Sequence, residues 1–524
     1  MVKRSELHTT SIPLSVHRYD MKNIRSVGYD MWKIRDLQPF FPAIEKLFKT
    51  EHVKDVRDIG LRFQNEILSI LSESTIRTIR GDEVPIHRKT TMLLSPYVWM
   101  RGEYGTSMTL PTSTPHASKR LSKLQTPNNA GYVGAMISAA LSDCRHFPTI
   151  YGILSGIAET HTIDISDDYG DLSERPWFSK HIGTLFDIQL SDEIQAHSEF
   201  KHTRCARTHL DLGEDLTLPD IQELVSEHPI ASMGDLQPVL QDEPMTDDHS
   251  DTSSVSTTHL FEIESCDCED DDDDYEEDED YEGFAWATFR DVPVQTTLME
   301  VCEGTFHQLC VLNPDSDKHL AWMTQVIFAL AYAQRKISFT HNDLHANNIM
   351  YVTCKDEYLT YNCEGKLYRV PTYGYLIKII DFERGIASIK LPNMREPKLF
   401  MSDQYGLDEE ASGMYNYGEF MSSKHAEIRP NPSVDLARLA TSVYWDLFPD
   451  ESDHRLCKMM RRWMSTEKGS VLFGTQNPKH DRYHGFELYK AIVRYCKDAV
   501  PRREIERLYD VFGVEHAEGP VLLV

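Results

Sequence analysis

The chain has 524 residues, 40% of them hydrophobic, which is enough for one large or two medium globular cores. Its formal net charge of −29 argues against a protein that binds nucleic acid through a basic surface. The ten cysteines lack framework spacing, and we find neither a signal-peptide pattern nor an apolar stretch of membrane length, so we expect an intracellular protein with free thiols.

The first 80 residues have the pattern of a polar, helical extension. Apolar side chains between Ile44 and Ile70 recur near the spacing of one helix face. From Gly81 the pattern changes, because EVPIHRKTTMLL alternates in part and is rich in β-branched residues. We therefore predict a helical N-terminal extension over residues 1–80 and a strand-rich region from residue 81.

Two elements and a long polar segment follow. NNAGYVGAMISAALSDC has a capping Asn and an apolar face, which predicts a helix, and a strand is expected from about Thr149. Residues 205–282 are polar, and residues 261–282 carry fifteen carboxylates and no basic side chain. Such a composition predicts a disordered acidic insertion, which leaves open a partner with a basic surface.

The regular pattern resumes at residue 283. A strand ends in TTLMEVCEGTF, a helix with an apolar face spans the region of Leu320 to Ala331, and FTHNDLHANNIMYV then predicts a loop followed by a strand. The apolar run YLIKII ends at Asp381, and the last third is largely helical. This order predicts a mixed α+β chain in two lobes rather than one layered sheet.

Polar residues at the ends of these elements suggest chemistry. Asp343 and Asn348 stand five apart in the loop that follows the helix, and Asp381 stands on the turn after the strand. Phosphoryl transfer needs one Asp to orient the attacking hydroxyl, and an Asn and a second Asp to hold Mg²⁺ against nucleotide phosphates. The three residues in this order therefore predict a phosphotransferase site.

H-x-D-x-x-x-x-N followed by D-F resembles the catalytic and metal-binding loops of the protein-kinase-like fold. The resemblance implies Asp343 as the base, and Asn348 and Asp381 as Mg²⁺ ligands. It also implies a small β-rich N-lobe over residues 81–204 and 283–301, a mostly helical C-lobe over residues 302–524, and ATP between them. His341 is expected to be a packed side chain that braces the loop.

The same resemblance suggests the remaining nucleotide contacts. Met299 would close the back of the pocket, and the backbones of Glu300 and Cys302 would pair with adenine. Lys89 is the candidate for the α- and β-phosphates, although SESTIRTIRGDE before it shows no glycine-rich loop. The predicted helix NNAGYVGAMISAALSDC has no Glu to pair with this lysine; Asp143 stands near its end.

A wider set of segments resembles the kinase-like family of large nucleocytoplasmic DNA viruses. The segments are MLLSPYVWMRGEYG, HFPTIYG, EGTF, HNDLHANNIMY, IIDFERGIA, NPSVDLARLATS and GFELYKAIVRY. In NPSVDLARLATS, Asp435 corresponds to the kinase Asp that holds the backbone of the catalytic loop. The likeness implies a viral serine/threonine protein kinase that acts on a protein substrate in the host cytoplasm or the virion.

Two alternatives remain at this point. D-L-H-x-x-N with I-D-F-E also resembles small-molecule phosphotransferases such as aminoglycoside and choline kinases, in which the chemistry is the same and the acceptor differs. The missing glycine-rich loop is compatible with a pseudokinase scaffold whose acidic insertion recruits a basic partner.

Overall fold

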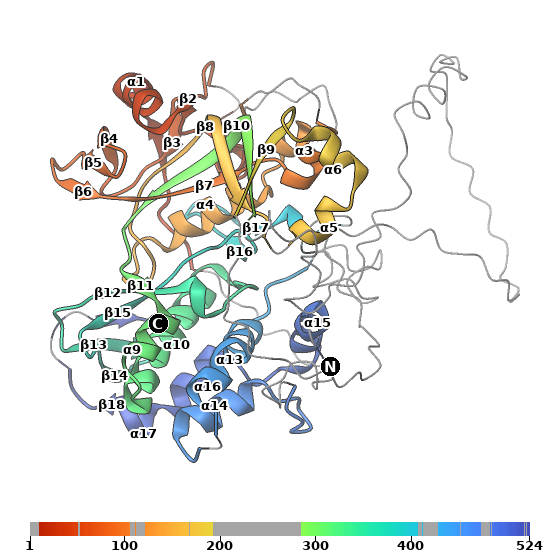
Figure 1. Cartoon of the computed structure of the whole chain (residues 1–524). Coiled ribbons are helices and arrows are strands. Elements are labelled where there is room, and N and C mark those ends of the chain that lie inside the picture. Colours follow the sequence, from red (N-terminus) through yellow and green to blue (C-terminus); the bar gives the residue numbers. More distant parts are fainter. Residues whose placement is uncertain are drawn as a thin grey trace, which may run out of the picture.

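The computed structural model describes residues 10–50, 53–104, 110–111, 121–166, 168–191, 285–406, 411, 428–450, 452–472, 483, 485–517, 519 and 521–524. The acidic insertion predicted for residues 205–282 lies outside these ranges. The described part of the chain is a mixed α+β structure with several small sheets. Figure 1 shows the largest sheet in its upper part and a group of helices in its lower part.

The largest sheet has five antiparallel strands. They are β2 (Ile34–Gln38), β7 (His87–Met92), β8 (Ile150–Asp164), β9 (Phe186–Leu190) and β10 (Ala285–Met299), in the order β2-β8-β10-β7 with β9 also on β10. The helix α4 (Ala130–Leu141) contacts β8 and β10 from one side and β16 (Ile386–Ile389) and β17 (Lys398–Met401) from the other (Figure 1). The helix α4 confirms the helix predicted in NNAGYVGAMISAALSDC, and β8 confirms the strand predicted from about Thr149.

The prediction of a long helical stretch between Ile44 and Ile70 is wrong. The region forms α2 (Ala43–Leu47), β3 (Ile59–Leu61) and β4 (Ile67–Ser72), and β4 pairs with β5 (Thr75–Thr78), which pairs with β6 (Glu83–Pro85). The β4–β5 register shifts between Ile67 and Ser69 and again between Ile70 and Ser72. Bulges of this kind let two residues three apart point the same way, so Ile67 and Ile70 are both buried in a strand with helix-like spacing.

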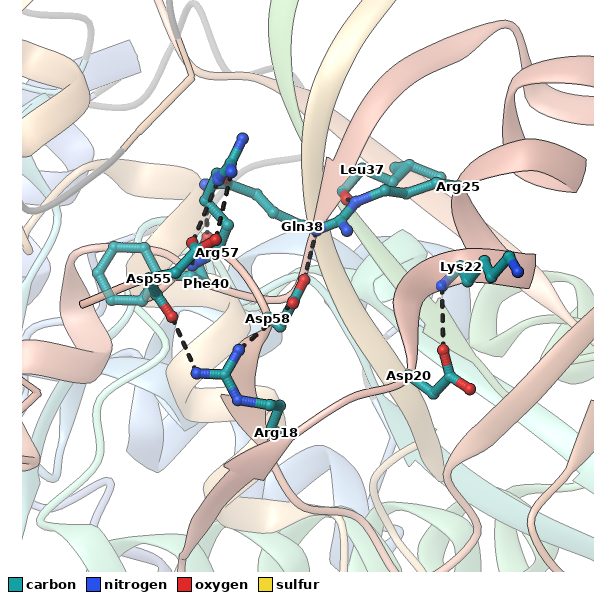
Figure 2. Close-up of polar contacts among 10 residues, drawn as sticks. All are labelled: Arg18, Asp20, Lys22, Arg25, Leu37, Gln38, Phe40, Asp55, Arg57 and Asp58. Carbon is teal, nitrogen blue, oxygen red and sulfur yellow. Dashed lines mark hydrogen bonds and ion pairs between the residues drawn. The ribbon is translucent and has the colours of Figure 1, made fainter. Parts of the chain in front are cut away.

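The first 80 residues belong to the same folded body as the sheet, because β2 pairs with β8. Ahead of β2, β1 (Val16–Arg18) pairs with β3 and leads into α1 (Met21–Trp32). The side chain of Asp20 caps the first turn of α1 by accepting a hydrogen bond from the amide of Lys22. Figure 2 shows the side chains of Arg18 and Arg25 reaching Asp58, at 3.4 and 2.6 Å. These ion pairs join β1 and α1 to the loop before β3.

In the described residues, the chain after β10 forms seven α-helices. They are α9 (Phe306–Leu312), α10 (Ser316–Ile337), α13 (Val434–Leu447), α14 (Arg455–Trp463), α15 (Gly485–Tyr495), α16 (Pro501–Arg507) and α17 (Tyr509–Phe512). The central helix α10 begins at its cap Asp315 and ends where Ser338 takes a left-handed backbone conformation with φ 48°. Nearly all of α10 is buried, which confirms the helix predicted around Leu320 to Ala331.

Seven short strands belong to the same part of the chain, and two of them, β14 and β15, contact α10. They are β11 (Gly304–Thr305), β12 (Ile349–Thr353), β13 (Tyr358–Cys363), β14 (Lys366–Pro371), β15 (Tyr375–Ile379), β18 (Gly513–Val514) and β19 (Val521–Leu523). The small helices α3 (Pro96–Met100), α5 (Tyr169–Ser173) and α6 (Pro176–His181) lie beside the large sheet (Figure 1). No helix in the described ranges has the length and apolar character needed to cross a membrane.

Candidate active site

A cavity of about 350 Å³ opens between the large sheet, α4 and the turn after β15. Its walls include side chains from β7, α4 and β10, the segment after β10, Met350 of β12 and residues 380–383. Five of the predicted site residues line it: Lys89, Met299, Glu300, Cys302 and Asp381. Residues far apart in the sequence therefore meet around one space.

Lys89 on β7 reaches across the cavity to two carboxylates. Its Nζ lies 2.6 Å from Oδ1 of Asp381 and 2.9 Å from Oε1 of Glu383. Burial alone would lower the pKa of Lys89, but the two carboxylates outweigh burial and raise the pKa above its ordinary value. The ammonium is therefore charged at neutral pH and is held at the cavity by the two carboxylates.

Asp381 stands on a constrained turn directly after β15. Its backbone is left-handed, with φ 64°, a conformation that costs free energy for a residue other than glycine and is frequent at functional sites. The next residue, Phe382, packs its ring against those of Phe147, Phe339 and His341. Burial opposes ionisation of Asp381, but Lys89 lowers its pKa below the ordinary value, so the carboxylate is ionised.

The loop of residues 341–348 is held from behind by a buried Asp. Both oxygens of Asp435, at the start of α13, accept from the amide of His341 at 3.0 and 2.9 Å, and Oδ1 also accepts from the amide of Asn342 at 3.0 Å. The ring of His341 is fully buried, and its Nε2 lies 2.7 Å from the carbonyl oxygen of Ile380. The bracing predicted for His341 and Asp435 is therefore present in the hydrogen bonds.

We expect Asp435→Ala to lower the free energy of unfolding by about 2–5 kcal/mol, because two buried amides lose their acceptor at once. Chemical denaturation measures the change. The matched control is Asp446→Ala on the same helix, where a half-exposed side chain pairs with His307 at 3.6 Å. A loss for Asp435→Ala no larger than that of the control would contradict the bracing role.

Asp343 and Asn348 lie on the braced loop. Asp343 Oδ2 is 3.2 Å from a guanidinium nitrogen of Arg384, and Oδ1 accepts from the hydroxyl of Tyr489 on α15 at 3.1 Å. Burial would raise the pKa of Asp343, but Arg384, together with His345, Arg438 and His341, outweighs burial and lowers the pKa, so the group is ionised near neutral pH. Asn348 Nδ2 donates to the backbone oxygen of Asp343 at 2.9 Å and lies 3.1 Å from Nε2 of His345.

The donor set around Asn348 and Asp381 fits Mg²⁺. The described ranges contain no cluster of three His, Cys, Asp or Glu side chains that could hold a metal. Mg²⁺ is usually bound by only one or two carboxylates, together with waters and substrate phosphates. Because the amide nitrogen of Asn348 is engaged inside its loop, Oδ1 is the atom through which Asn348 would bind a metal.

The segment after β10 leaves two backbone groups available at the cavity. The Glu300 amide donates to the carbonyl of Thr149, and its carboxylate accepts from the Thr149 amide at 3.0 Å and from Lys378 Nζ at 2.8 Å. Within the described residues, the carbonyl of Glu300 and the amide of Cys302 have no hydrogen-bond partner. Burial raises the pKa of the Cys302 thiol to about 11, so this cysteine is not a nucleophile at neutral pH.

We expect Lys378→Met to destabilise the fold by about 3 kcal/mol, since it leaves the carboxylate of Glu300 without its buried cation. The double variant Lys378→Met with Glu300→Gln should recover part of the loss, because no uncompensated charge remains. Denaturant unfolding of the two variants and the wild type measures this coupling. Equal losses in the single and double variants would show that the pair is not coupled.

Three residues of the site were not predicted. Glu383 and Arg384 directly follow Asp381-Phe382, so their proximity in sequence was a usable signal, whereas Tyr489 lies 146 residues from Asp343 and gave none. Asp143 is not the partner of Lys89, because it pairs with Lys336 on α10. The carboxylates that contact Lys89 are those of Asp381 and Glu383, on the turn after β15.

Comparisons with known proteins add little. No protein-family model matches the chain. A curated protein of Caenorhabditis elegans, named Uncharacterized protein ZK177.2, is 31% identical to this chain over 62 residues. That stretch is 12% of this chain and 21% of the nematode protein, so the chain spans about a fifth of the relative that it matches. The likeness carries neither a family nor an activity over to this chain.

Proposed function

We propose that the chain is an ATP- and Mg²⁺-dependent phosphotransferase with a two-lobed, protein-kinase-like fold. The large sheet with α4 would form the N-lobe, and the chain from residue 302 the C-lobe. One observation carries the proposal: Lys89 crosses the cavity to Asp381, while Asp343 and Asn348 are held on the adjacent braced loop. The order of these residues in the sequence matches the ordered motif from which the site was predicted.

The nucleotide would occupy the 350 Å³ cavity. The unpaired carbonyl of Glu300 and amide of Cys302 offer an acceptor and a donor to the edge of adenine, with Met299 closing the back. The ammonium of Lys89 would bind the α- and β-phosphates. Asn348 and Asp381 would hold Mg²⁺, which neutralises phosphate charge as transfer proceeds.

Transfer itself depends on Asp343. The acceptor hydroxyl donates a hydrogen bond to the carboxylate of Asp343, which orients its oxygen toward the γ-phosphorus. The new O–P bond forms as the bond between the γ-phosphorus and the bridging oxygen of ADP breaks, and Asp343 takes the hydroxyl proton. Such catalysis consists mainly of positioning and charge stabilisation.

For the acceptor we propose serine and threonine hydroxyls of proteins, as in a viral serine/threonine kinase of the host cytoplasm or virion. The likeness to the viral kinase-like family supports this choice, because its segments extend from the region of Lys89 to α15. The alternative of a small-molecule acceptor is supported by a shorter part of the chain, the D-L-H-x-x-N and I-D-F-E motifs.

Transfer of ³²P from [γ-³²P]ATP tests the proposal. The purified chain with Mg²⁺ is offered a basic protein acceptor and, separately, a panel of aminoglycosides and choline-like compounds. Label on protein supports the proposed function. Label only on small molecules replaces the protein acceptor by a small one, and no label with any acceptor would contradict phosphotransfer and favour the pseudokinase scaffold.

A further inference from the structure

Glu383 is an acidic residue that lines the cavity and that the proposed mechanism does not use. Its Oε1 lies 2.9 Å from Lys89 Nζ and accepts a hydrogen bond from the hydroxyl of Thr91, which also lies on β7. The side chain is about one-fifth exposed, so it is largely shielded from water. Glu383 thus links the turn that carries Asp381 to the strand that carries Lys89.

The neighbouring helix is shaped to admit this side chain. The residues of α4, AGYVGAMISAAL, include no acid. A Cβ placed on Gly134 would lie 3.0 Å from Cγ of Glu383 and 3.4 Å from its backbone nitrogen, so glycine leaves the room in which Glu383 lies. The carboxylate of Glu383 therefore reaches Lys89 from the turn after β15, and it lies against Gly134 of α4.

We propose that Glu383 is the positioning residue for Lys89, an inference that rests on the proposed phosphotransfer. When Asp381 binds Mg²⁺, its carboxylate must share its oxygens between the metal and Lys89. Glu383 is not a proposed metal ligand, so its carboxylate stays paired with Lys89 and keeps the ammonium at the phosphates. Without Glu383, the flexible four-carbon chain of Lys89 follows Asp381 or moves into solvent.

The inference predicts a loss of turnover without a loss of fold. We expect Glu383→Gln to lower kcat by about 10- to 100-fold, since a displacement of about 1 Å at a reacting group has effects of this size. The affinity for Mg²⁺ with the non-hydrolysable ATP analogue AMP-PNP should fall by a smaller factor, and Tm should stay close to that of the wild type. Glu396→Gln, an exposed carboxylate between β16 and β17, is the matched control.

Relocating the charge separates positioning from a merely structural role. Glu383→Ala empties the space beside Gly134, and Glu383→Ala combined with Gly134→Glu returns a carboxylate to the same space from α4. We expect the double variant to regain at least tenfold of the kcat lost in Glu383→Ala, and to regain its affinity for Mg²⁺·AMP-PNP.

The outcomes distinguish this inference from the proposed function. If the wild type transfers phosphate and Glu383→Gln keeps both its kcat and its nucleotide affinity, the inference is wrong and the proposed function stands. If the wild type binds Mg²⁺·AMP-PNP but transfers nothing, the proposed function fails, and the binding titrations of the same variants still decide whether Glu383 positions Lys89. A wild type that binds no nucleotide overturns both.

Discussion

Replacing Asp343 with Asn is expected to lower kcat for phosphate transfer by about 100- to 10 000-fold, the range in which a general base contributes. The carboxylate accepts the hydroxyl proton in the proposed mechanism, and an amide cannot do so. Affinity for Mg²⁺·ATP should change little, because in the proposed mechanism Asp343 contacts the acceptor hydroxyl and neither the metal nor the nucleotide. Single-turnover transfer and calorimetric nucleotide titration measure the two quantities separately.

The surroundings of Asp343 indicate that Asp343→Asn changes the charge of the side chain without disturbing its packing. Asn has nearly the same size as Asp, and its oxygen can still accept from the hydroxyl of Tyr489 or lie beside Arg384. Asp446→Asn, an exposed change on α13, is the control and should transfer phosphate like the wild type. Full transfer by Asp343→Asn would show that another group accepts the proton or that none is needed.

Replacing Asp381 with Asn should remove most of the dependence of nucleotide binding on Mg²⁺. The amide carries no charge to offset the metal, so we expect the affinity for Mg²⁺·ATP to fall by at least about tenfold, equivalent to about 1.4 kcal/mol, and transfer to be lost. Binding of ATP without Mg²⁺ should be retained, because the sites proposed for adenine do not involve Asp381. Titration with ATP in the presence and absence of Mg²⁺ measures both effects.

The same substitution spares the backbone. Asp381 has φ 64°, and Asn is one of the few residues that adopt this left-handed conformation readily. Asp381→Asn should therefore fold like the wild type, with Lys89 still paired to Glu383. An unchanged Mg²⁺ dependence in the folded variant would remove Asp381 from the set of metal ligands.

The parts of the site that could be predicted are those encoded over short distances in the sequence. Asp343 and Asn348 are five residues apart on one loop, and Asp381 follows a strongly apolar strand, so local patterns alone suggest them as candidates. Lys89 follows from the resemblance, which implies a lysine on a strand of the N-lobe, and the structure places it in the cavity with Asp381.

The parts that could not be predicted depend on tertiary packing. The spacing of Ile67 and Ile70 is the same in a helix and in a bulged strand, and only the pairing of β4 with β5 decides between them. The resemblance implies an acidic partner for Lys89 on the helix that is α4. The space beside Gly134 that admits Glu383 instead depends on how α4 packs against the turn. Tyr489 meets Asp343 only because α15 packs near the loop.

The strand order of the large sheet has a consequence for folding. β2 pairs with β8, and β8 pairs with β10, so residues near position 35 and residues near position 295 must come together in one sheet. Sheets built from such distant segments have high contact order and form slowly. During synthesis β8 has to wait for β10, with a long unpaired edge exposed, and this interval is when the nascent chain is most exposed to aggregation.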